Sequence, residues 1–194
     1  MEDHVRTITR GLRRGAVALA ALTVGAGALI TPAPVAAVVT ETSAVFVNEL
    51  HYDNAGTDTG EFVEIVGPAG TDLTGWSVVL YNGSNGEVYD TIALGGSFAD
   101  SGEGYGFRVV ELPSNGLQNG SPDGLALVDA SDTLVEFLSY EGAFSAVGGP
   151  ADGEVSTDIG VSEPGTTPIG QSLQRTGTGS TAGDFVWTGP ATES

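Results

Sequence analysis

The sequence predicts an all-β fold, either a sandwich or a barrel, that follows an N-terminal leader. Short runs rich in β-branched and aromatic residues alternate with clusters of Gly, Asn, Asp, Ser and Thr, and all but four of the 30 glycines lie after residue 37. Glycines in such clusters supply turns between strands. No segment after residue 37 has the apolar period of a useful helix. Many short strands joined by tight turns are typical of all-β domains.

Residues 1–37 have the features of a secretory signal peptide. Four arginines lie in residues 1–15, residues 16–30 carry no charge, and small residues at Val35 and Ala37 suit a signal peptidase. The alternative is a retained membrane anchor. A span requires about 20 apolar residues, whereas Pro32 and Pro34 interrupt this run soon after 15. We therefore expect cleavage, a secreted extracellular protein, and no membrane attachment after cleavage.

The chain after the leader is strongly acidic. Four of the six basic residues and two of the 25 acids lie in residues 1–37, so the remainder has only Arg108 and Arg175 against 23 acids, a formal charge of −21. Such a surface repels phosphate backbones, so no direct nucleic-acid binding is expected. It favours divalent cations, or serves solubility alone. The absence of cysteine leaves the domain without disulfides.

The first two strands are expected at residues 45–52 and 61–66, joined by a turn-rich loop at 53–60. Val63 and Ile65 should share one face of the second strand. In the first strand Asn48 and Glu49 are adjacent, so a regular strand must point one of them inward. A buried polar side chain there would need a hydrogen-bond partner.

The remaining strands follow in short runs. They are expected at 77–81, 87–94 and 105–111, then at 125–129 and 133–140 as a hairpin, and finally at 171–175 and 184–188. Residues 141–170 show no periodicity, and a loop of that length usually has a function or is disordered. The predicted core comprises apolar positions from these strands: Val47, Val63, Ile65, Trp76, Val78, Leu80, Leu127 and Leu134.

Several segments, in this order and spacing, resemble the lamin tail domain, in particular its bacterial, exported branch. The segments with the resemblance are Asn-Glu-Leu at 48–50, Glu-Phe-Val-Glu-Ile at 61–65, Leu-Thr-Gly-Trp at 73–76, Gly-Leu-Ala-Leu-Val-Asp at 124–129, Ser-Tyr-Glu-Gly at 139–142, Asp-Ile-Gly-Val at 158–161, Ser-Leu-Gln-Arg at 172–175 and Asp-Phe-Val-Trp at 184–187. No single segment is specific, but their ordered sum covers nearly the whole chain after the leader.

The resemblance implies an immunoglobulin-like β-sandwich and a non-catalytic binding or accessory module. It places a linker at 38–43, the domain at 44–190 and a tail at 191–194. Such modules occur in exported bacterial proteins beside nuclease or phosphatase domains. We therefore expect a monomer that binds another protein or a cell-surface component. This sequence shows no catalytic domain beside the module. We therefore expect either a stand-alone module or a truncated member of the family.

The densest group of acids lies in the first loop and suggests a metal site. Asp53, Asp58 and Glu61, with Asn54 among them, would offer hard oxygen ligands on a glycine-containing loop, as Ca²⁺ prefers. The spacing differs from that of the EF-hand. The alternative is turn chemistry, because Asp and Asn in loops also stabilise turns through their own backbone.

A second hypothesis for the same loop is a metal-dependent hydrolase, a nuclease or a phosphatase. His51 is the only histidine after the leader, and with Asp53 and Glu61 it could act as base and ligand. With no lysine, no cysteine and two arginines, the chain has few groups to activate a nucleophile or to stabilise a phosphoryl transition state. We therefore favour a binding module, in which loops or exposed strand edges recognise the partner.

Overall fold

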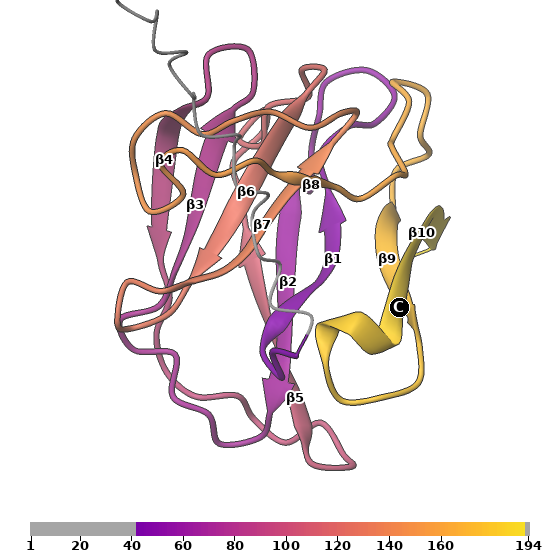
Figure 1. Cartoon of the computed structure of the whole chain (residues 1–194). Helices are drawn as coiled ribbons and strands as arrows, with labels where there is room; N and C mark the ends of the chain where they lie inside the picture. The colour runs from indigo at the N-terminus through magenta and orange to yellow at the C-terminus, as the bar shows by residue number, and fades with distance from the viewer. Residues whose placement is uncertain (1–41, 193–194) are drawn as a thin grey trace, which may run out of the picture. The chain divides into compact units, whose positions relative to one another are not determined.

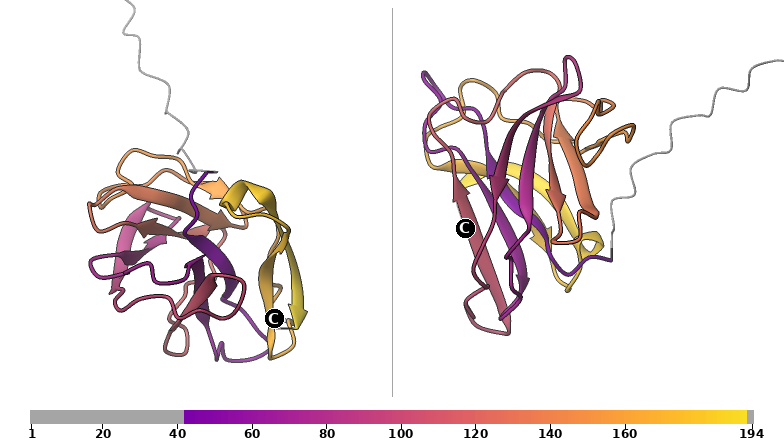
Figure 2. Two further views of the ribbon diagram at one scale, coloured as in Figure 1. Left: turned by 90° about the horizontal axis from the view of Figure 1, so that it is seen from below. Right: turned by 90° about the vertical axis from the view of Figure 1, so that its left-hand side faces the viewer.

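The computed structural model describes residues 42–192, which form two five-stranded sheets packed as a sandwich (Figures 1 and 2). The predicted signal peptide and residues 38–41 of the linker lie outside the described residues, as do residues 193–194. No α-helix occurs between residues 42 and 192, and no helix there is long and apolar enough to cross a membrane. The all-β fold predicted from the turn-rich pattern is therefore confirmed, and of the two expected forms, sandwich and barrel, the structure shows the sandwich.

The first sheet has the strand order β10-β9-β1-β2-β5 and the second has the order β4-β3-β6-β7-β8. Their bounds are β1 Phe46–His51, β2 Phe62–Pro68, β3 Ser77–Asn82, β4 Glu87–Ala93, β5 Tyr105–Glu111, β6 Asp123–Val128, β7 Leu134–Tyr140, β8 Thr157–Asp158, β9 Gln171–Gly177 and β10 Phe185–Thr192, with one 3-10 turn at Ala182–Asp184. All strand pairs are antiparallel except β7 with β8.

Every strand expected from the sequence is present, with shifts of a few residues at the ends. Two features were not predicted. The segment 141–170, which has no periodicity, contributes β8 and crosses the second sheet. Strand β10 continues to Thr192, two residues beyond the predicted end of the domain.

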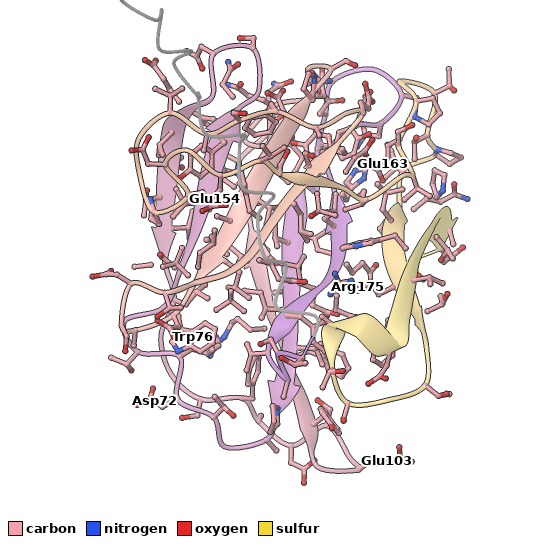
Figure 3. All side chains as sticks on the ribbon, viewed as in Figure 1. Asp72, Trp76, Glu103, Glu154, Glu163 and Arg175 are labelled. Atoms are coloured by element: carbon pink, nitrogen blue, oxygen red, sulfur yellow. The ribbon has the colours of Figure 1, made fainter. Side chains whose placement is uncertain are left out.

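The core lies between the inner faces of the two sheets. Six of the eight predicted core residues are fully buried, since their alternation along the strands places them inward: Val47, Val63, Ile65, Val78, Leu80 and Leu127. The prediction was wrong in degree for Trp76 and Leu134, which are only partly buried. Trp76 precedes β3 at the end of the sandwich opposite Glu163 (Figure 3), where its ring covers the core from outside.

The expectation that Asn48 or Glu49 must point into the core was wrong, because β1 contains a bulge, but the expected buried polar side chain with a hydrogen-bond partner is present at Glu49, which is 2% exposed. The register against β2 shifts between Val47 and Glu49, so one extra residue is inserted in β1. Asn48 donates from Nδ2 to Glu64 on β2 at 2.9 Å, and Glu49 accepts a hydrogen bond from Ser172 on β9. Both side chains therefore bond to neighbouring strands of their own sheet.

The outer faces of the two sheets differ. Tyr81 and Phe137 on the second sheet are covered by Phe144 from the segment 141–170, with the Phe137 and Phe144 rings 5.3 Å apart in an edge-to-face arrangement. On the first sheet, Phe107 and Val109 of β5 remain 46% and 49% exposed. The long segment thus covers the second sheet. On the first sheet Ala182 and Phe185 cover Phe46 and Val66, and the exposed apolar side chains are those of β5.

Candidate functional site

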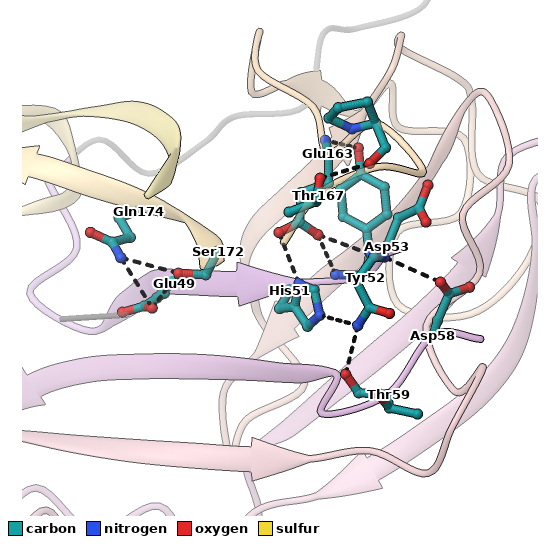
Figure 4. Close-up of polar contacts among 12 residues, drawn as sticks. Glu49, His51, Tyr52, Asp53, Asp58, Thr59, Glu163, Thr167, Ser172 and Gln174 are labelled. Carbon is teal, nitrogen blue, oxygen red and sulfur yellow. Dashed lines mark hydrogen bonds and ion pairs between the residues drawn. The ribbon is translucent and has the colours of Figure 1, made fainter. Parts of the chain in front are cut away.

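A residue from a distant segment organises the end of β1, where the sequence predicts the candidate site. Glu163, fully buried, lies beside the end of β1 (Figure 4). Its Oε1 lies 2.9 Å from Nδ1 of His51, and its Oε2 accepts the backbone N–H groups of Tyr52 at 2.6 Å and Asp53 at 3.0 Å. One carboxylate therefore accepts hydrogen bonds from three donors at the point where β1 ends.

The neighbours of His51 fix its tautomer. Nδ2 of Asn54 lies 2.9 Å from Nε2 of His51 and 2.8 Å from the carbonyl oxygen of Thr59. A carbonyl only accepts, so the amide nitrogen must face it, and that nitrogen then donates its second proton to Nε2. Nε2 accepts, and the ring proton lies on Nδ1 and is donated to Glu163.

This arrangement gives His51 a structural environment. The side chain is 2% exposed, and each ring nitrogen has a hydrogen-bond partner. A general base must reach the proton that it removes from a substrate, whereas Nε2 of His51 faces Asn54 inside the protein. The geometry thus gives the hydrolase hypothesis no exposed imidazole at this position.

Two tyrosines extend the network into the core. The rings of Tyr52 and Tyr140 stack at 3.9 Å with an interplanar angle of 14°. The Tyr52 hydroxyl accepts the Glu163 N–H at 2.8 Å and donates to Glu141 at 3.0 Å, and the Tyr140 hydroxyl donates to the Gln118 carbonyl. Burial raises the pKa of both phenols well above their usual value, so both remain donors.

Glu61, one of the predicted metal ligands, is bound to the loop after β5. Its two carboxylate oxygens accept the backbone N–H groups of Gly116 at 2.8 Å and Leu117 at 3.2 Å, which holds the loop after β5 against the start of β2. Burial raises the pKa of Glu61, and these two amides oppose that rise. Since its oxygens are engaged, Glu61 acts as a link between β2 and the loop.

Asp53 and Asp58 do come together. Asp58 accepts the Asn54 N–H at 3.2 Å and a proton from Nδ2 of Asn119 at 3.1 Å. The pKa of Asp53 is raised, first by burial and then by the adjacent carboxylate of Asp58. Oδ1 of Asn54 is buried and has no hydrogen-bond partner among residues 42–192. Oxygen donors from these three residues therefore lie within one loop.

The structure does not gather the full predicted set of metal ligands. Within residues 42–192, no three side chains of His, Asp or Glu are placed so that they could hold one metal ion. Asp53 and Asp58 suit a hard cation in their chemistry, with Asn54 in place of Glu61. Calcium at this loop stays a prediction with that changed ligand set.

Sequence reasoning missed two buried charged residues besides Glu163. Glu136 on β7 accepts the Val47 N–H at 2.7 Å and a proton from Nη2 of Arg175 on β9 at 2.8 Å, so it joins the two sheets. The Arg175 guanidinium also lies 5.2 Å from the centre of the Phe46 ring and 5.0 Å from that of Trp187. The sequence offers one indication, because Glu136 interrupts an apolar run.

The outer face of the first sheet contains two neighbouring grooves. The acidic groove, about 530 Å³, lies over β1, β2 and β5, and the aromatic groove, about 570 Å³, lies beside it toward the 3-10 turn. The acidic groove is lined by Glu49, Gly60, Glu61, Phe62, Glu64, Val109, Glu111 and Leu112. The aromatic groove includes Phe46, Val66, Tyr105, Phe107 and Phe185.

Comparison of the chain with protein-family models, with curated proteins and with solved structures finds no match.

Proposed function

We propose that this chain is an exported, non-catalytic binding module with an immunoglobulin-like sandwich of the lamin tail type. In this proposal it assists an exported nuclease or phosphatase, or takes part in a cell-surface assembly. Its partner is another protein or a cell-surface component, bound by a monomer of this chain.

One contrast supports the proposal. The chemically versatile side chains of the first loop, His51 and Glu61, are buried and engaged in internal hydrogen bonds. The outer face of the first sheet instead presents exposed apolar side chains, Phe107 and Val109, beside acidic ones. Exposed apolar surface bordered by polar groups is typical of interaction sites rather than of reaction centres.

A capture experiment tests the accessory role. An affinity-tagged chain is incubated with the exported proteins of its own host, and an equally acidic, unrelated exported domain serves as the control. The proposal expects one nuclease or phosphatase, or one surface component, retained in a stoichiometric ratio by this chain only. Equal retention by both domains, or retention of nothing, would contradict it.

The calcium site is a second candidate, and a specific observation favours it. The Asp53 and Asp58 carboxyl groups lie together, in the same loop as the buried Oδ1 of Asn54, which has no hydrogen-bond partner among residues 42–192. A bound divalent cation would turn the repulsion between the two carboxylates into attraction. Asp53, Asp58 and Asn54 would then be its ligands, with Glu61 outside the set.

A further inference from the structure

Strand β5 forms one edge of the first sheet. The hydrogen bonds at its two ends show which of its residues bond to β2 through their backbone groups. The Leu112 N–H donates to the Glu61 carbonyl at 2.9 Å, and the Ala69 N–H donates to the Gly104 carbonyl at 2.9 Å. In an antiparallel pair, residues that exchange hydrogen bonds alternate with residues that do not. The even-numbered residues of β5 therefore bond to β2.

The odd-numbered residues consequently direct their backbone groups to the open edge. These are Phe107, Val109 and Glu111, and their N–H and C=O groups have no hydrogen-bond partner within residues 42–192. The side chains of the same three residues are exposed on the outer face of the sheet. An open edge with exposed side chains of this kind is a template for an added strand.

The face beside this edge changes in character along its length. Near Glu111 it is acidic, because the exposed Glu111 and the half-buried Glu64 line the acidic groove, whereas Glu49 and Glu61 in the same groove are buried and bonded within the chain. Near Phe107 it is aromatic, because Phe107 belongs to the aromatic groove. A strand added along β5 would thus pass from carboxylates to aromatic rings.

The described part of this chain has no cation to place over the acidic groove. Its two basic residues are Arg108 and Arg175. Arg108 donates from Nη2 to the Gly95 carbonyl, and Arg175 is buried against Glu136. Burial raises the pKa of the half-buried Glu64, so its charge is costly unless a positive group approaches.

We infer that the β5 edge binds an extended basic peptide segment of a partner protein as an additional antiparallel strand. This rests on the proposed binding function and names the class of partner. A second copy of this chain carries the same large excess of acids over basic residues, so it would be repelled rather than attracted. The added strand is expected to run antiparallel to β5, because antiparallel pairs are somewhat more stable than parallel ones. We expect the partner segment to place Arg or Lys opposite Glu111, an aliphatic residue opposite Val109 and an aromatic residue opposite Phe107.

The probe is the peptide Arg-Thr-Val-Thr-Phe, acetylated and amidated at its ends and labelled with a fluorophore. Its binding to the purified full-length chain is followed by fluorescence anisotropy. In the inferred register the N–H of the central Val faces β5, and that of the second Thr faces away. Methylation of the Val nitrogen should weaken binding by about tenfold or more, because it removes a ladder hydrogen bond and adds bulk at the edge. Methylation of the Thr nitrogen should leave binding within about twofold, since that N–H makes no ladder bond.

Charge variants of the chain test the register independently. Glu111→Gln should weaken binding by about two- to fivefold and reduce its salt dependence, because it removes the cross-strand charge pair with the Arg of the peptide. Asp132→Asn, in an exposed turn between β6 and β7 where Asn tolerates the φ of 59°, is the matched control and should change nothing.

Several results would overturn the inference: no saturable binding, equal loss with the two methylated peptides, or an equal effect of Asp132→Asn. Tight binding of the peptide with Glu in place of Arg would overturn it as well. If the peptide does not bind but the chain still retains a partner in the capture experiment, the proposed binding function stands and only the assignment of the site to β5 is wrong.

Discussion

The Glu163 carboxylate lies 2.9 Å from Nδ1 of His51, although 112 residues separate the two in the sequence. Glu163→Ala should lower the free energy of unfolding by about 3–5 kcal/mol, because the His51 ring proton and two backbone N–H groups would lose a buried acceptor. Chemical denaturation measures this cost.

The control for Glu163→Ala is Glu111→Gln, which alters an exposed acid on β5 and should change stability by less than about 0.5 kcal/mol. An equal, small effect of both substitutions would mean that Glu163 does not hold the end of β1. Nitrogen NMR of His51 provides a second readout, with the ring proton expected on Nδ1.

The buried ion pair between Glu136 and Arg175 should be sensitive to the loss of its cation. Arg175→Met leaves the fully buried Glu136 carboxylate without its counter-charge and should cost about 3–5 kcal/mol in urea unfolding. Arg108→Met is the matched control, and it should cost less than about 1 kcal/mol because Arg108 is only partly buried and makes one hydrogen bond. Similar costs for both variants would contradict the claim that Arg175 stabilises the buried Glu136 carboxylate.

Stability should be highest at mildly acidic pH. Burial raises the pKa values of Asp53, Glu61 and Glu64 above their ordinary 3.8 and 4.5, so the folded state binds protons more readily than the unfolded state. Between the unfolded and folded pKa values, stability therefore falls as pH rises. Thermal unfolding should show a higher midpoint at about pH 5 than at pH 7.

Three other acids act in the opposite sense at lower pH. Hydrogen bonds lower the pKa values of Asp72, Asp129 and Asp184 below 3.8, and the stability that these carboxylates contribute is lost as pH falls through the folded pKa values. The midpoint should thus decline again below about pH 4. Glu64→Gln should reduce the gain between pH 7 and pH 5, and an unchanged gain would argue against a raised pKa at Glu64.

Calcium should stabilise the chain if Asp53, Asp58 and Asn54 bind it. At a hundredfold excess over Kd, binding to the folded state adds about 2.7 kcal/mol, and Kd values of extracellular modules are roughly 10⁻⁴ to 10⁻³ M. The melting temperature should rise more in millimolar Ca²⁺ than in Mg²⁺, which demands stricter geometry. NaCl at matched ionic strength controls for screening. An equal shift in NaCl, or an unchanged response after Asp53→Asn and Asp58→Asn, would exclude this loop.

Local pattern was sufficient to predict the strands and most of the core. Val63 and Ile65 alternate with polar or exposed positions, and their burial follows from the period of a strand. The bulge at Asn48 was not predictable in this way, because it inserts a residue without any change in composition. The burial of Trp76 was overestimated, since a large ring at the end of a strand can cover a core without entering it.

The partners of the first loop could not be predicted from the sequence. Nothing in residues 141–170 distinguishes Glu163 from Glu141 or Glu154, and only the path of the chain across the second sheet brings Glu163 to His51. Glu61 looked like a metal ligand because it ends an acidic loop, yet its oxygens face the amides after β5. Long-range contacts therefore decide which acids are structural.

The central claim, that this chain binds rather than catalyses, is tested most directly by a hydrolysis assay. The purified chain is incubated with DNA, RNA and a generic phosphate ester in the presence of Mg²⁺, Mn²⁺ or Ca²⁺, beside the His51→Ala variant. Because His51 is 2% exposed and its ring nitrogens face Glu163 and Asn54, we expect all three substrates to remain intact. Turnover by the native chain that disappears in His51→Ala would contradict the claim and identify the end of β1 as a reaction centre.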